Sequence, residues 1–585
     1  MIRVVAWLKA QARSLARWRA QRAALTEVAQ ASGEPTRRDD SMRLLVAGGT
    51  LVLAAVAYLY GLDRAFIPSI GDEPFYLQIA RRTAESGRLL PLLSDSGITN
   101  TKPPLLFWLG AAVTRLGGDL GALRLPIVLL TFATAAAVGD LARRISGRVV
   151  IGLLSAALFL AYRSTIQHGR PFLTNAGETL FLFLPLLWVH RRDRIGPGRM
   201  IACGLSLGAA ALCKSFALIV PGVAALGLVL LQRGGYDLRA ALRRHGPVLV
   251  GMAAIALLAF IGWIVLDPRP DLIVSQFIVG ENAGKLRLQD FANGLFSGPY
   301  PIWRIWLAPV LNAGLLAPLV VGLLVDLWRR RRALPTEEAE LWTYVLAFLV
   351  VYSVPTHRQE NYLLPAGAAL AVLLGLRWDA LAAGWFRTAL VPLAVAAAAL
   401  PVLQRQVERS LSESLWSPWA LALPALIAAA ALTGAVRERL GRLLLPALTF
   451  GALLATTNFL APFSRPFPPA ALAEVRGRVV LYPERFQREY ELGRTLVPGA
   501  DVRGYPCPPG PEPCPAPWTS TAYVAWLAAS GEAPPPGYRV VAETPHLRTR
   551  HSAAEIERIA AGDLGLLVER LVLVRPERLA ASSAR

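Results

Sequence analysis

Charged residues are scarce in this sequence: Asp, Glu, Lys and Arg make up 17% of its 585 residues, whereas 54% are hydrophobic. The mean hydropathy of +0.43 is too high for a soluble protein of this size. Because apolar runs recur along most of the chain, we expect a polytopic α-helical membrane protein.

Negative charge is scarcer than positive charge, and the formal net charge is +21. The positive charge falls in short arginine clusters between apolar runs, which is typical of loops retained on the cytoplasmic side of a membrane. A nucleic-acid partner is therefore a poor explanation of the charge. The first 43 residues are arginine-rich and lack an apolar core, so no cleavable signal peptide is evident. We expect residues 1–42 to form a basic amphipathic helix on the cytoplasmic surface.

Cysteine is also rare, with four residues in the chain. Cys203 and Cys213 lie inside apolar runs and are expected to be small packing residues. Cys507 and Cys514 flank the proline-rich stretch CPPGPEPC. They predict a disulfide if this part of the chain is exported, and the alternative is two free thiols.

The arginine clusters order the apolar runs into spans. The stretch LLFWLGAAVTRL at residues 105–116 is too short to span comfortably, and we expect it to lie along the membrane. The remaining runs predict about thirteen spans between residues 43 and 461, with the amino terminus inside. These spans are residues 43–61, 123–142, 149–162, 173–190, 200–213, 215–232, 247–266, 303–327, 341–355, 361–376, 385–403, 416–435 and 443–461.

An odd number of spans places residues 462–585 outside, in the bacterial periplasm. Short β-like runs such as RVVLYPE (478–484) and YRVVAET (538–544) alternate there with helical stretches. We therefore expect a small periplasmic α/β domain. Two further outer segments are expected at residues 62–122 and 267–302 of the transmembrane domain, which covers residues 43–461.

Unusual polar residues of mixed sign gather on the outer side of this topology. A mixed-sign cluster at the membrane edge indicates a functional site. These residues are Asp72, Glu73, Lys102, Arg170, Lys214, Glu281, Asn282, Lys285, His357, Arg358, Glu360 and Tyr362.

Each of these residues also has a structural interpretation. Lys214 could be an anchor whose amine reaches the membrane surface, and Arg170 could solvate a helix end. Asp72 and Glu73 precede a stretch of helical period, where acids favour the helix start, so Asp72 could be only an N-cap. The coincidence of so many polar residues on one face favours a functional site, since packing does not require it.

Several stretches resemble the GT-C class of lipid-dependent glycosyltransferases, in the branch of protein O-mannosyltransferases and the bacterial aminoarabinose transferases of lipid A. The landmarks occur in order over residues 43–376. They are Asp72-Glu73-Pro74-Phe75-Tyr76 as DE-x-x-Y, KPPLLFW from Lys102, Arg170 with Asn175 five positions later, AALCKSFALIVPG around Lys214, GENAGK with Glu281, Asn282 and Lys285, and HRQENYLLP with Arg358 and Tyr362.

The resemblance implies an inner-membrane enzyme that takes a sugar from a polyprenyl phosphate and passes it to a lipid, glycan or protein acceptor at the periplasmic face. Such a donor needs no Gly-rich phosphate loop, and the sequence shows none. Asp72 is the expected base, with Glu73 as helper or structural partner. The expected ligands of the donor phosphate are Lys102, Arg170, Lys214, Arg358 and Tyr362. The expected substrate-binding residues are Tyr76, Asn175, Glu281, Asn282 and Lys285.

The sequence departs from the aminoarabinose transferases at three places. Phe75 stands where they have an arginine, Thr101 stands where they have a glutamate before KPP, and residues 267–300 contain no histidine. The glutamate and the histidine are implicated in metal binding in that family. We therefore expect no metal and no other cofactor; the alternative is a magnesium ion that Asp72 and Glu73 hold against the lipid phosphate.

Two other functions compete with a glycosyltransferase. A transporter or flippase of a lipid-linked sugar would also place polar groups near lipid, although close to the membrane midplane and between inverted repeats, which are not evident here. A membrane scaffold for envelope glycan assembly would use its exported tail to bind a partner.

Overall fold

The computed structural model describes residues 37–66, 71–192, 194–282, 295–411, 413–485, 487–508, 512, 514–528, 532–548 and 550–577, with the backbone alone for residues 37–40. The expected amphipathic segment before residue 37 and the candidate residue Lys285 lie outside these ranges.

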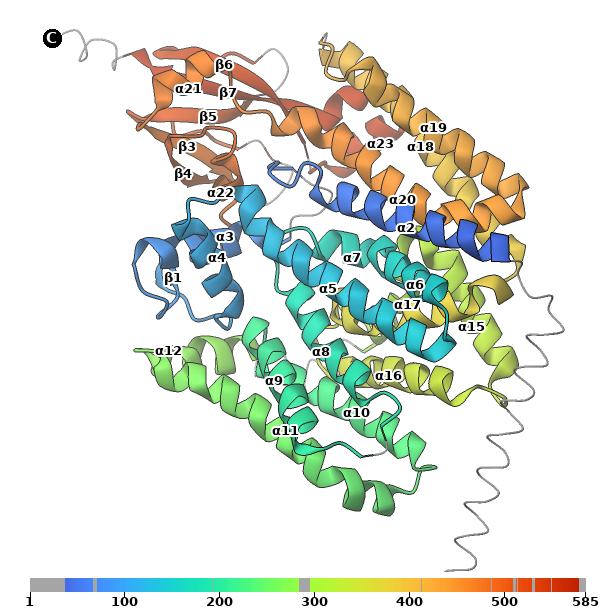
Figure 1. Ribbon diagram of the computed structural model, residues 1–585. Coiled ribbons are helices and arrows are strands. Elements are labelled where there is room, and N and C mark those ends of the chain that lie inside the picture. Colours follow the sequence, from blue (N-terminus) through green and yellow to red (C-terminus); the bar gives the residue numbers. More distant parts are fainter. Residues whose placement is uncertain are drawn as a thin grey trace, which may run out of the picture.

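Long helices form most of the structure, and each segment predicted to span the membrane contains at least one of them (Figure 1). The long helices are α2 (Arg37–Leu59), α5 (Leu120–Ser146), α6 (Val149–Ala161), α8 (Asn175–Val189), α9 (Pro197–Cys213), α10 (Ile219–Arg233), α11 (Leu238–Leu266), α14 (Ile302–Leu311), α15 (Ala317–Arg330), α16 (Thr336–Ser353), α17 (Leu364–Arg377), α18 (Ala383–Leu411), α19 (Pro418–Val436) and α20 (Glu438–Leu460). Short helical turns join them: α7 (Arg163–His168), η1 (Phe216–Leu218), η4 (Gly314–Leu316), η5 (Glu360–Leu363), η6 (Trp378–Ala380) and η7 (Ala461–Ser464).

Length and apolar composition identify the helices that can cross a membrane. Within the described part of the chain, eight helices pass this test, or nine if one sharply bent pair counts as a single span. Helices α6, α8 and α9 are apolar but shorter. The protein is therefore a multi-pass membrane protein, and the count of thirteen spans stays a prediction.

The hairpin of α5 and α6 shows how sequence sets the packing of these helices. Asp119 caps α5 by accepting a hydrogen bond from the Ala122 amide at 2.8 Å, and Gly147 ends it at φ +71°. A Cβ on Gly152 would lie 2.7 Å from the carbonyl oxygen of Gly139. The two helices therefore approach as closely as they do because neither position carries a side chain.

The segment predicted as one span at residues 303–327 is a sharply bent pair of helices, which is either a broken span or a re-entrant loop. Helices α14 and α15 meet at an angle of 89°. Gly314 stands at the bend with φ +60°, and a Cβ there would lie 2.6 Å from the Cβ of Arg163. The Asn312 side chain fixes the corner by donating to the carbonyl oxygen of Glu360 at 2.7 Å. The hydropathy of the segment could not reveal this turn.

The two predicted outer segments carry short elements. The first contains α3 (Glu73–Glu85), the strands β1 (Leu93–Ser94) and β2 (Gly97–Ile98), and α4 (Leu105–Arg115), the short apolar helix expected from the sequence. The second begins with α12 (Pro270–Leu272) and a ten-residue π-helix, η2 (Ile273–Asn282), where the sequence suggested only a loop.

The carboxy-terminal part is a five-stranded mixed sheet with short helices, as the α/β prediction required. The strands are β3 (Val479–Glu484), β4 (Asp501–Pro506), β5 (Tyr523–Ala528), β6 (Tyr538–Leu547) and β7 (Val568–Pro576), in the order β4-β3-β5-β7-β6. Strand β3 pairs in parallel with β4 and β5, whereas β7 pairs antiparallel with β5 and β6. The helices are α21 (Pro469–Val475), α22 (Tyr490–Gly493), α23 (Ala553–Ala560) and η8 (Leu564–Leu567).

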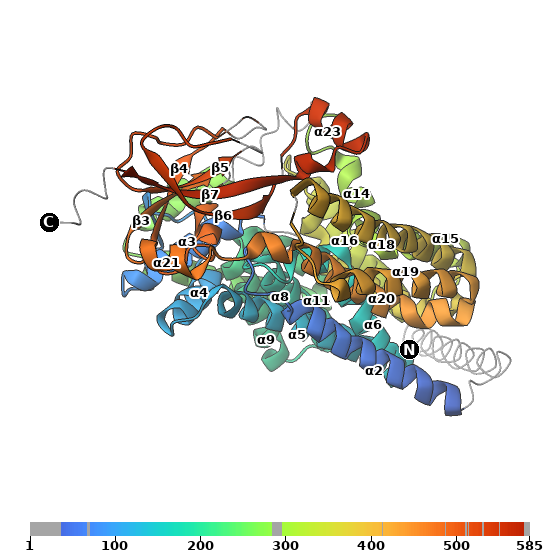
Figure 2. The ribbon, with the colours of Figure 1, turned by 90° about the horizontal axis from the view of Figure 1, so that it is seen from above.

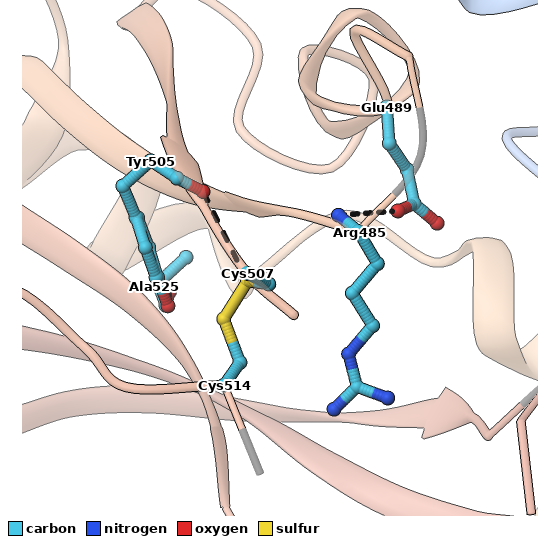
Figure 3. The surroundings of a disulfide bond; sticks show 6 residues. All are labelled: Arg485, Glu489, Tyr505, Cys507, Cys514 and Ala525. Carbon is cyan, nitrogen blue, oxygen red and sulfur yellow. Dashed lines mark hydrogen bonds between the residues drawn. A yellow bond between two sulfur atoms is a disulfide. The ribbon is translucent and has the colours of Figure 1, made fainter. Parts of the chain in front are cut away.

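Cys507 and Cys514 are joined by a disulfide with Cα atoms 4.9 Å apart (Figure 3). Cys507 directly follows β4, and Cys514 is buried among side chains such as Trp526 on one face of the sheet. The other two cysteines, Cys203 and Cys213, are buried thiols, as their apolar surroundings predicted.

The sheet packs against the membrane part at one end of the helix bundle, beside α3 (Figures 1 and 2). Val480 and Leu571 on one face of the sheet share an apolar core with Leu77 and Ile79 of α3 and Phe463 after α20. One continuous core therefore joins the carboxy-terminal sheet to the segment that contains α3.

Polar contacts strengthen the same junction. Arg81 pairs with Glu491 of α22 at 2.6 Å, and Asp95 accepts hydrogen bonds from Arg82 and from the Tyr490 hydroxyl. Burial acts to raise the pKa of Asp95, but its bonds with Tyr490 and Arg82 outweigh burial and lower that pKa. These five residues, named here the α3–sheet contact, hold α3 against the carboxy-terminal part.

Candidate functional site

Asp72 stands at the start of α3, at the position that caps the helix. Its side chain accepts no hydrogen bond from the first turn of the helix, and the residue is exposed. An Asp at a helix start normally gains about 1 kcal/mol from such a bond. The capping interpretation of Asp72 therefore lacks its essential contact, and the carboxylate is available for other chemistry.

Tyr76 lies one turn after Asp72 and is 5% exposed. Burial raises the pKa of its phenol, and the negative charges of Asp72, Glu281 and Glu178 raise that pKa further. A phenol under these conditions stays protonated and can donate a hydrogen bond. Tyr76 therefore lies within electrostatic range of these three carboxylates.

Glu73 faces the other way and is fully buried. Its carboxylate makes two bonds with the Arg124 guanidinium, at 2.7 and 2.6 Å, and accepts the Phe172 amide at 2.6 Å. Arg124 also donates to the carbonyl oxygens of Leu62 and Arg64. These contacts fasten the start of α3 to α5 and correspond to the structural role that was one of the two expected for Glu73.

Lys102 of the KPP motif pairs with Glu281, at the end of η2, with 2.9 Å between Nζ and Oε2. The neighbouring Asn282 accepts a hydrogen bond from the Ser215 hydroxyl at 2.8 Å. The two outer segments therefore meet through residues that the sequence had singled out separately.

Lys214 follows the last residue of α9, where the chain breaks before α10. Its Nζ lies 2.6 Å from the Glu178 carboxylate and 4.8 Å from the centre of the Tyr362 ring. Asn175 lies one helical turn from Glu178 and donates to it at 3.5 Å. An anchor to the membrane surface would direct its amine outward, whereas Lys214 is paired with a fully buried carboxylate.

Several polar atoms around this group are buried without a hydrogen-bond partner in the described structure. Leaving such an atom unsatisfied costs about 1–3 kcal/mol, so each calls for a partner such as water or a bound ligand. They are both amide atoms of Asn100, Oγ1 of Thr101, Nδ1 of His168, Oε1 of Glu178, the Tyr352 hydroxyl and Oδ1 of Asn361.

These atoms border the ion pairs. Asn100 and Thr101 directly precede Lys102, and Asn361 directly precedes Tyr362. The Tyr352 ring lies 5.5 Å from that of Tyr362. A ligand with several hydrogen-bonding groups, such as a sugar or a phosphate, would satisfy them.

Two predicted phosphate ligands donate hydrogen bonds to backbone carbonyl oxygens. Arg170 is buried and donates to the carbonyl oxygens of Tyr58 and Tyr60 and to the Thr457 hydroxyl. Arg358 is buried and donates to the carbonyl oxygens of Ser353 and Tyr300. Both guanidiniums fasten chain segments together.

The sequence analysis missed Glu178 and Arg124, which hold two of the predicted residues. Glu178 was detectable, because it is the only acidic residue in the apolar helix α8 and follows Asn175 by three positions. Arg124 stands at the beginning of an apolar run, so the sequence offered no sign that it differs from other residues at the start of a helix. Among the described residues, no group of three or more His, Cys, Asp or Glu is placed to hold a metal ion.

Parts of the chain are similar to known proteins. Residues 101–265 match the family model described as dolichyl-phosphate-mannose-protein mannosyltransferase. The undecaprenyl phosphate-α-4-amino-4-deoxy-L-arabinose arabinosyl transferase of Serratia proteamaculans is 27% identical over 350 residues, which are 57% of this chain and 60% of that protein. The protein of the same name from Yersinia pestis is 25% identical over 350 residues, with the same coverage. The chain thus spans about 60% of the length of the curated relatives that it matches.

Solved structures extend the similarity to the fold. ArnT from Cupriavidus metallidurans superposes with a TM-score of 0.54 at 18% identity in the apo state, over 77% of this chain and 84% of that one. The same protein bound to undecaprenyl phosphate gives a TM-score of 0.54 at 20% identity, over 77% and 85%. In sequence motifs and in fold, the chain is therefore similar to the GT-C class of polyprenyl-phosphate-sugar-dependent glycosyltransferases.

Proposed function

We propose that this protein is an inner-membrane glycosyltransferase that moves a sugar from a polyprenyl-phosphate donor to an acceptor at the periplasmic face. The observation that carries the proposal is the grouping of the uncapped Asp72 carboxylate and the Tyr76 phenol with the Lys102 and Lys214 ion pairs. Unsatisfied buried polar atoms surround these pairs. The names of the relatives support the donor class.

The reaction follows from these side chains. An acceptor oxygen attacks the anomeric carbon, a C–O bond forms, and the bond from that carbon to the phosphate oxygen breaks. The electron pair leaves with the polyprenyl phosphate, and Asp72 takes the proton of the acceptor. A single displacement of this kind inverts the anomeric centre.

Two lysines supply the positive charge that the leaving phosphate needs. Lys102 and Lys214 each carry three N–H donors, and their carboxylate partners hold them in place before the donor arrives. The Nζ of Lys214 lies over the Tyr362 ring, and the Tyr362 hydroxyl is a further expected donor to the phosphate. Charge stabilisation by fixed groups of this type is commonly the largest contribution to catalysis.

The orientation in the membrane is part of the proposal. Arginine clusters at residues 143–148, 329–332 and 437–442 lie at helix ends away from α3 and the sheet, which supports a cytoplasmic location for that end. A reporter active only in the periplasm, fused after residue 470, is expected to be active. An inactive fusion there, with an active fusion after residue 335, would reverse the orientation.

The test of function uses the purified full-length protein and a panel of polyprenyl-phosphate sugars, including 4-amino-4-deoxy-L-arabinose, with lipid, glycan and peptide acceptors. Released polyprenyl phosphate and the glycosylated acceptor are measured by mass spectrometry. Release with at least one donor and acceptor pair supports the proposal. Movement of an intact donor across vesicle membranes without release would instead show a flippase, and binding without either would show a scaffold.

A further inference from the structure

A pocket lies at one edge of the carboxy-terminal sheet, outside the group of residues assigned to the proposed reaction. Its cavity volume is about 580 Å³, which is in the range usual for small-molecule sites. The sequence motifs described above all lie before residue 377, so none of them accounts for it. We name it the sheet-end pocket, and its lining residues are Glu484, Arg485, Gln487, Arg488, Gly504 and Pro506.

The sheet-end pocket stands at the carboxyl ends of two parallel strands. Glu484 is the last residue of β3, Pro506 is the last residue of β4, and the two are register partners. In open α/β sheets, ligands commonly bind in the crevice outside these strand ends. Gly504 keeps the two strand ends close, because a Cβ there would clash with the Glu484 carboxylate.

Arg485 follows β3 directly and lines the pocket. Its backbone amide donates to the Glu489 carboxylate at 3.3 Å, whereas Figure 3 shows its side chain extending away from that carboxylate. Nε of Arg485 is buried and has no hydrogen-bond partner in the described structure. Because a guanidinium is always charged and carries five N–H donors, Arg485 has donors left for a ligand.

The acids around Arg485 are engaged with other groups. Glu484, the one acid among the described lining residues, accepts the Arg488 amide at 2.8 Å and lies 3.8 Å from the Arg488 guanidinium. Glu569 lies within electrostatic range of Arg485, but its carboxylate is 3.1 Å from Nδ1 of His546. After Arg488 is paired with Glu484, the charge of Arg485 remains for the pocket.

The turn after β3 holds Arg488 in a left-handed conformation, with φ +59°. Residues with a side chain rarely adopt this region. Such conformations persist where the surrounding structure fixes them, and they cluster at ligand-binding sites. Here the bond from the Arg488 amide to Glu484 fixes the turn, and the turn brings two arginines to one pocket.

The sheet-end pocket is linked to α3 through the next few residues of the chain. Glu491 follows Arg488 by three positions and pairs with Arg81 of α3 at 2.6 Å. Arg81 lies nine residues after Asp72, so about 14 Å separates them along the helix axis. A ligand that reaches both the pocket and Asp72 must therefore be longer than a single sugar ring.

We propose that the sheet-end pocket binds an oxyanion, a phosphate or a carboxylate, of the acceptor glycan, with the Arg485 guanidinium as its main ligand. A guanidinium binds either group through two parallel N–H···O bonds, and the exposed amide of Gln487 adds a neutral donor. The role of this ligand as acceptor rests on the proposed function. The acceptor is an acidic glycan of more than one ring, anchored at the sheet while another part of it reaches Asp72.

The test is isothermal titration calorimetry of the purified full-length protein with matched disaccharide probes. Trehalose 6-phosphate carries the phosphate and lactobionate the carboxylate, and trehalose and lactose are their neutral counterparts. At least one charged probe is expected to bind about tenfold or more tightly than its counterpart, and the tighter one identifies the oxyanion. Equal binding of charged and neutral probes in both pairs overturns the proposal.

Variants then locate the site. Arg485→Gln is expected to weaken binding of the charged probe about tenfold or more, because it removes a hydrogen bond between charged groups. The matched control is Arg503→Gln, which removes the same charge from an exposed pair with Asp501 on β4 and should bind as the unmodified protein does. An equal loss in both variants would show non-specific attraction only. Binding that Lys102→Ala abolishes and Arg485→Gln preserves would place the probe at the lysines and refute the pocket.

A further variant should change binding in the opposite direction. Glu484→Gln keeps an oxygen that can accept the Arg488 amide and removes the one acid among the described lining residues, so it should tighten binding of the charged probe severalfold. Weaker binding in this variant would contradict the proposal. Thermal unfolding shows that each variant is folded, and Glu484→Gln keeps the test decisive if Arg485→Gln is not.

The role in acceptor binding has its own measurement. In the release assay, Arg485→Gln should raise the KM of an acidic acceptor about tenfold. An unchanged KM, with probe binding lost, would refute the acceptor role. Because calorimetry needs no turnover, a failure of the proposed function in the release assay is distinguished from a failure of the sheet-end pocket.

Discussion

Replacing Asp72 separates a catalytic carboxylate from a helix cap. Asp72 and Asp119 are both exposed and both precede a helix, but only Asp119 accepts a capping hydrogen bond, from the Ala122 amide at 2.8 Å. Loss of a side-chain cap costs about 0.5–2 kcal/mol. We therefore expect Asp119→Ala to lower the unfolding temperature of the protein and Asp72→Ala to leave it nearly unchanged.

The turnover rate should show the reverse pattern, with a large loss on replacing Asp72 and almost none on replacing Asp119. Removing a general base costs about a hundredfold to ten-thousandfold in rate, which corresponds to about 2.7–5.5 kcal/mol of activation free energy. Asp72→Asn keeps the shape of the side chain and should lose this much turnover while donor binding persists. Asp119→Asn should turn over at a near-normal rate.

The assay is the release of polyprenyl phosphate, measured by mass spectrometry beside thermal unfolding of the same preparations. Turnover of Asp72→Asn within about threefold of the unmodified protein would refute the catalytic assignment. A loss of stability in Asp72→Ala equal to that in Asp119→Ala would show that Asp72 is a cap after all.

Four further predictions follow from contacts described above. Lys102→Ala should weaken donor binding and lower the turnover rate, each about tenfold or more, because the ammonium contacts the phosphate in both the ground state and the transition state. Titration calorimetry measures the binding and the release assay measures the rate; a change in rate alone would contradict this prediction. Because the pKa of Asp95 is lowered in the folded state, its contact stabilises that state above the unfolded pKa of about 3.9, and this stabilisation is lost as the pH falls through the lower folded pKa. Hydrogen exchange of the backbone amides in α3 and α22 should therefore become faster below about pH 4. In Asp95→Asn the exchange should already be faster at pH 7. In protein taken from membranes, Cys507 and Cys514 should resist alkylation until the disulfide is reduced, and mass spectrometry that finds both thiols alkylated without reduction would count against the bond. The disulfide should add about 2.5 kcal/mol to the free energy of unfolding, because it restricts the unfolded chain. Turnover should survive exhaustive chelation, since Thr101 replaces a carboxylate of the relatives and the lysines carry the charge; loss of activity that magnesium, manganese or zinc restores would show that a metal is needed.

Sequence alone located the helices because their signals are local. Apolar runs and arginine clusters set where α2 and α5 begin and end, and β-like runs gave β3 and β6. The bend at Gly314 depends on contact with Arg163, which lies 151 positions earlier, so hydropathy predicted a span there but could not predict its bend.

For the site residues too, local signals revealed their positions but not their distant partners. Motifs found Asp72, Lys102 and Lys214, because each follows an apolar run or stands beside a distinctive proline pair. The role of Glu73 depended on Arg124, 51 positions away, and that of Lys214 on Glu178, 36 positions away. Partners at such separations are set by the packing of helices, which a single sequence does not reveal.

Helix α3 is clamped from two sides, by Glu73 and Arg124 in the membrane part and by the α3–sheet contact in the soluble tail. This has a consequence for protein engineering. A chimera that takes its tail from a relative would keep the membrane clamp and lose the outer one, unless residues 78–95 are exchanged together with the segment around Tyr490 and Glu491. The tail and the first outer segment therefore form one exchangeable module, although their paired residues lie 395 to 410 positions apart in the chain.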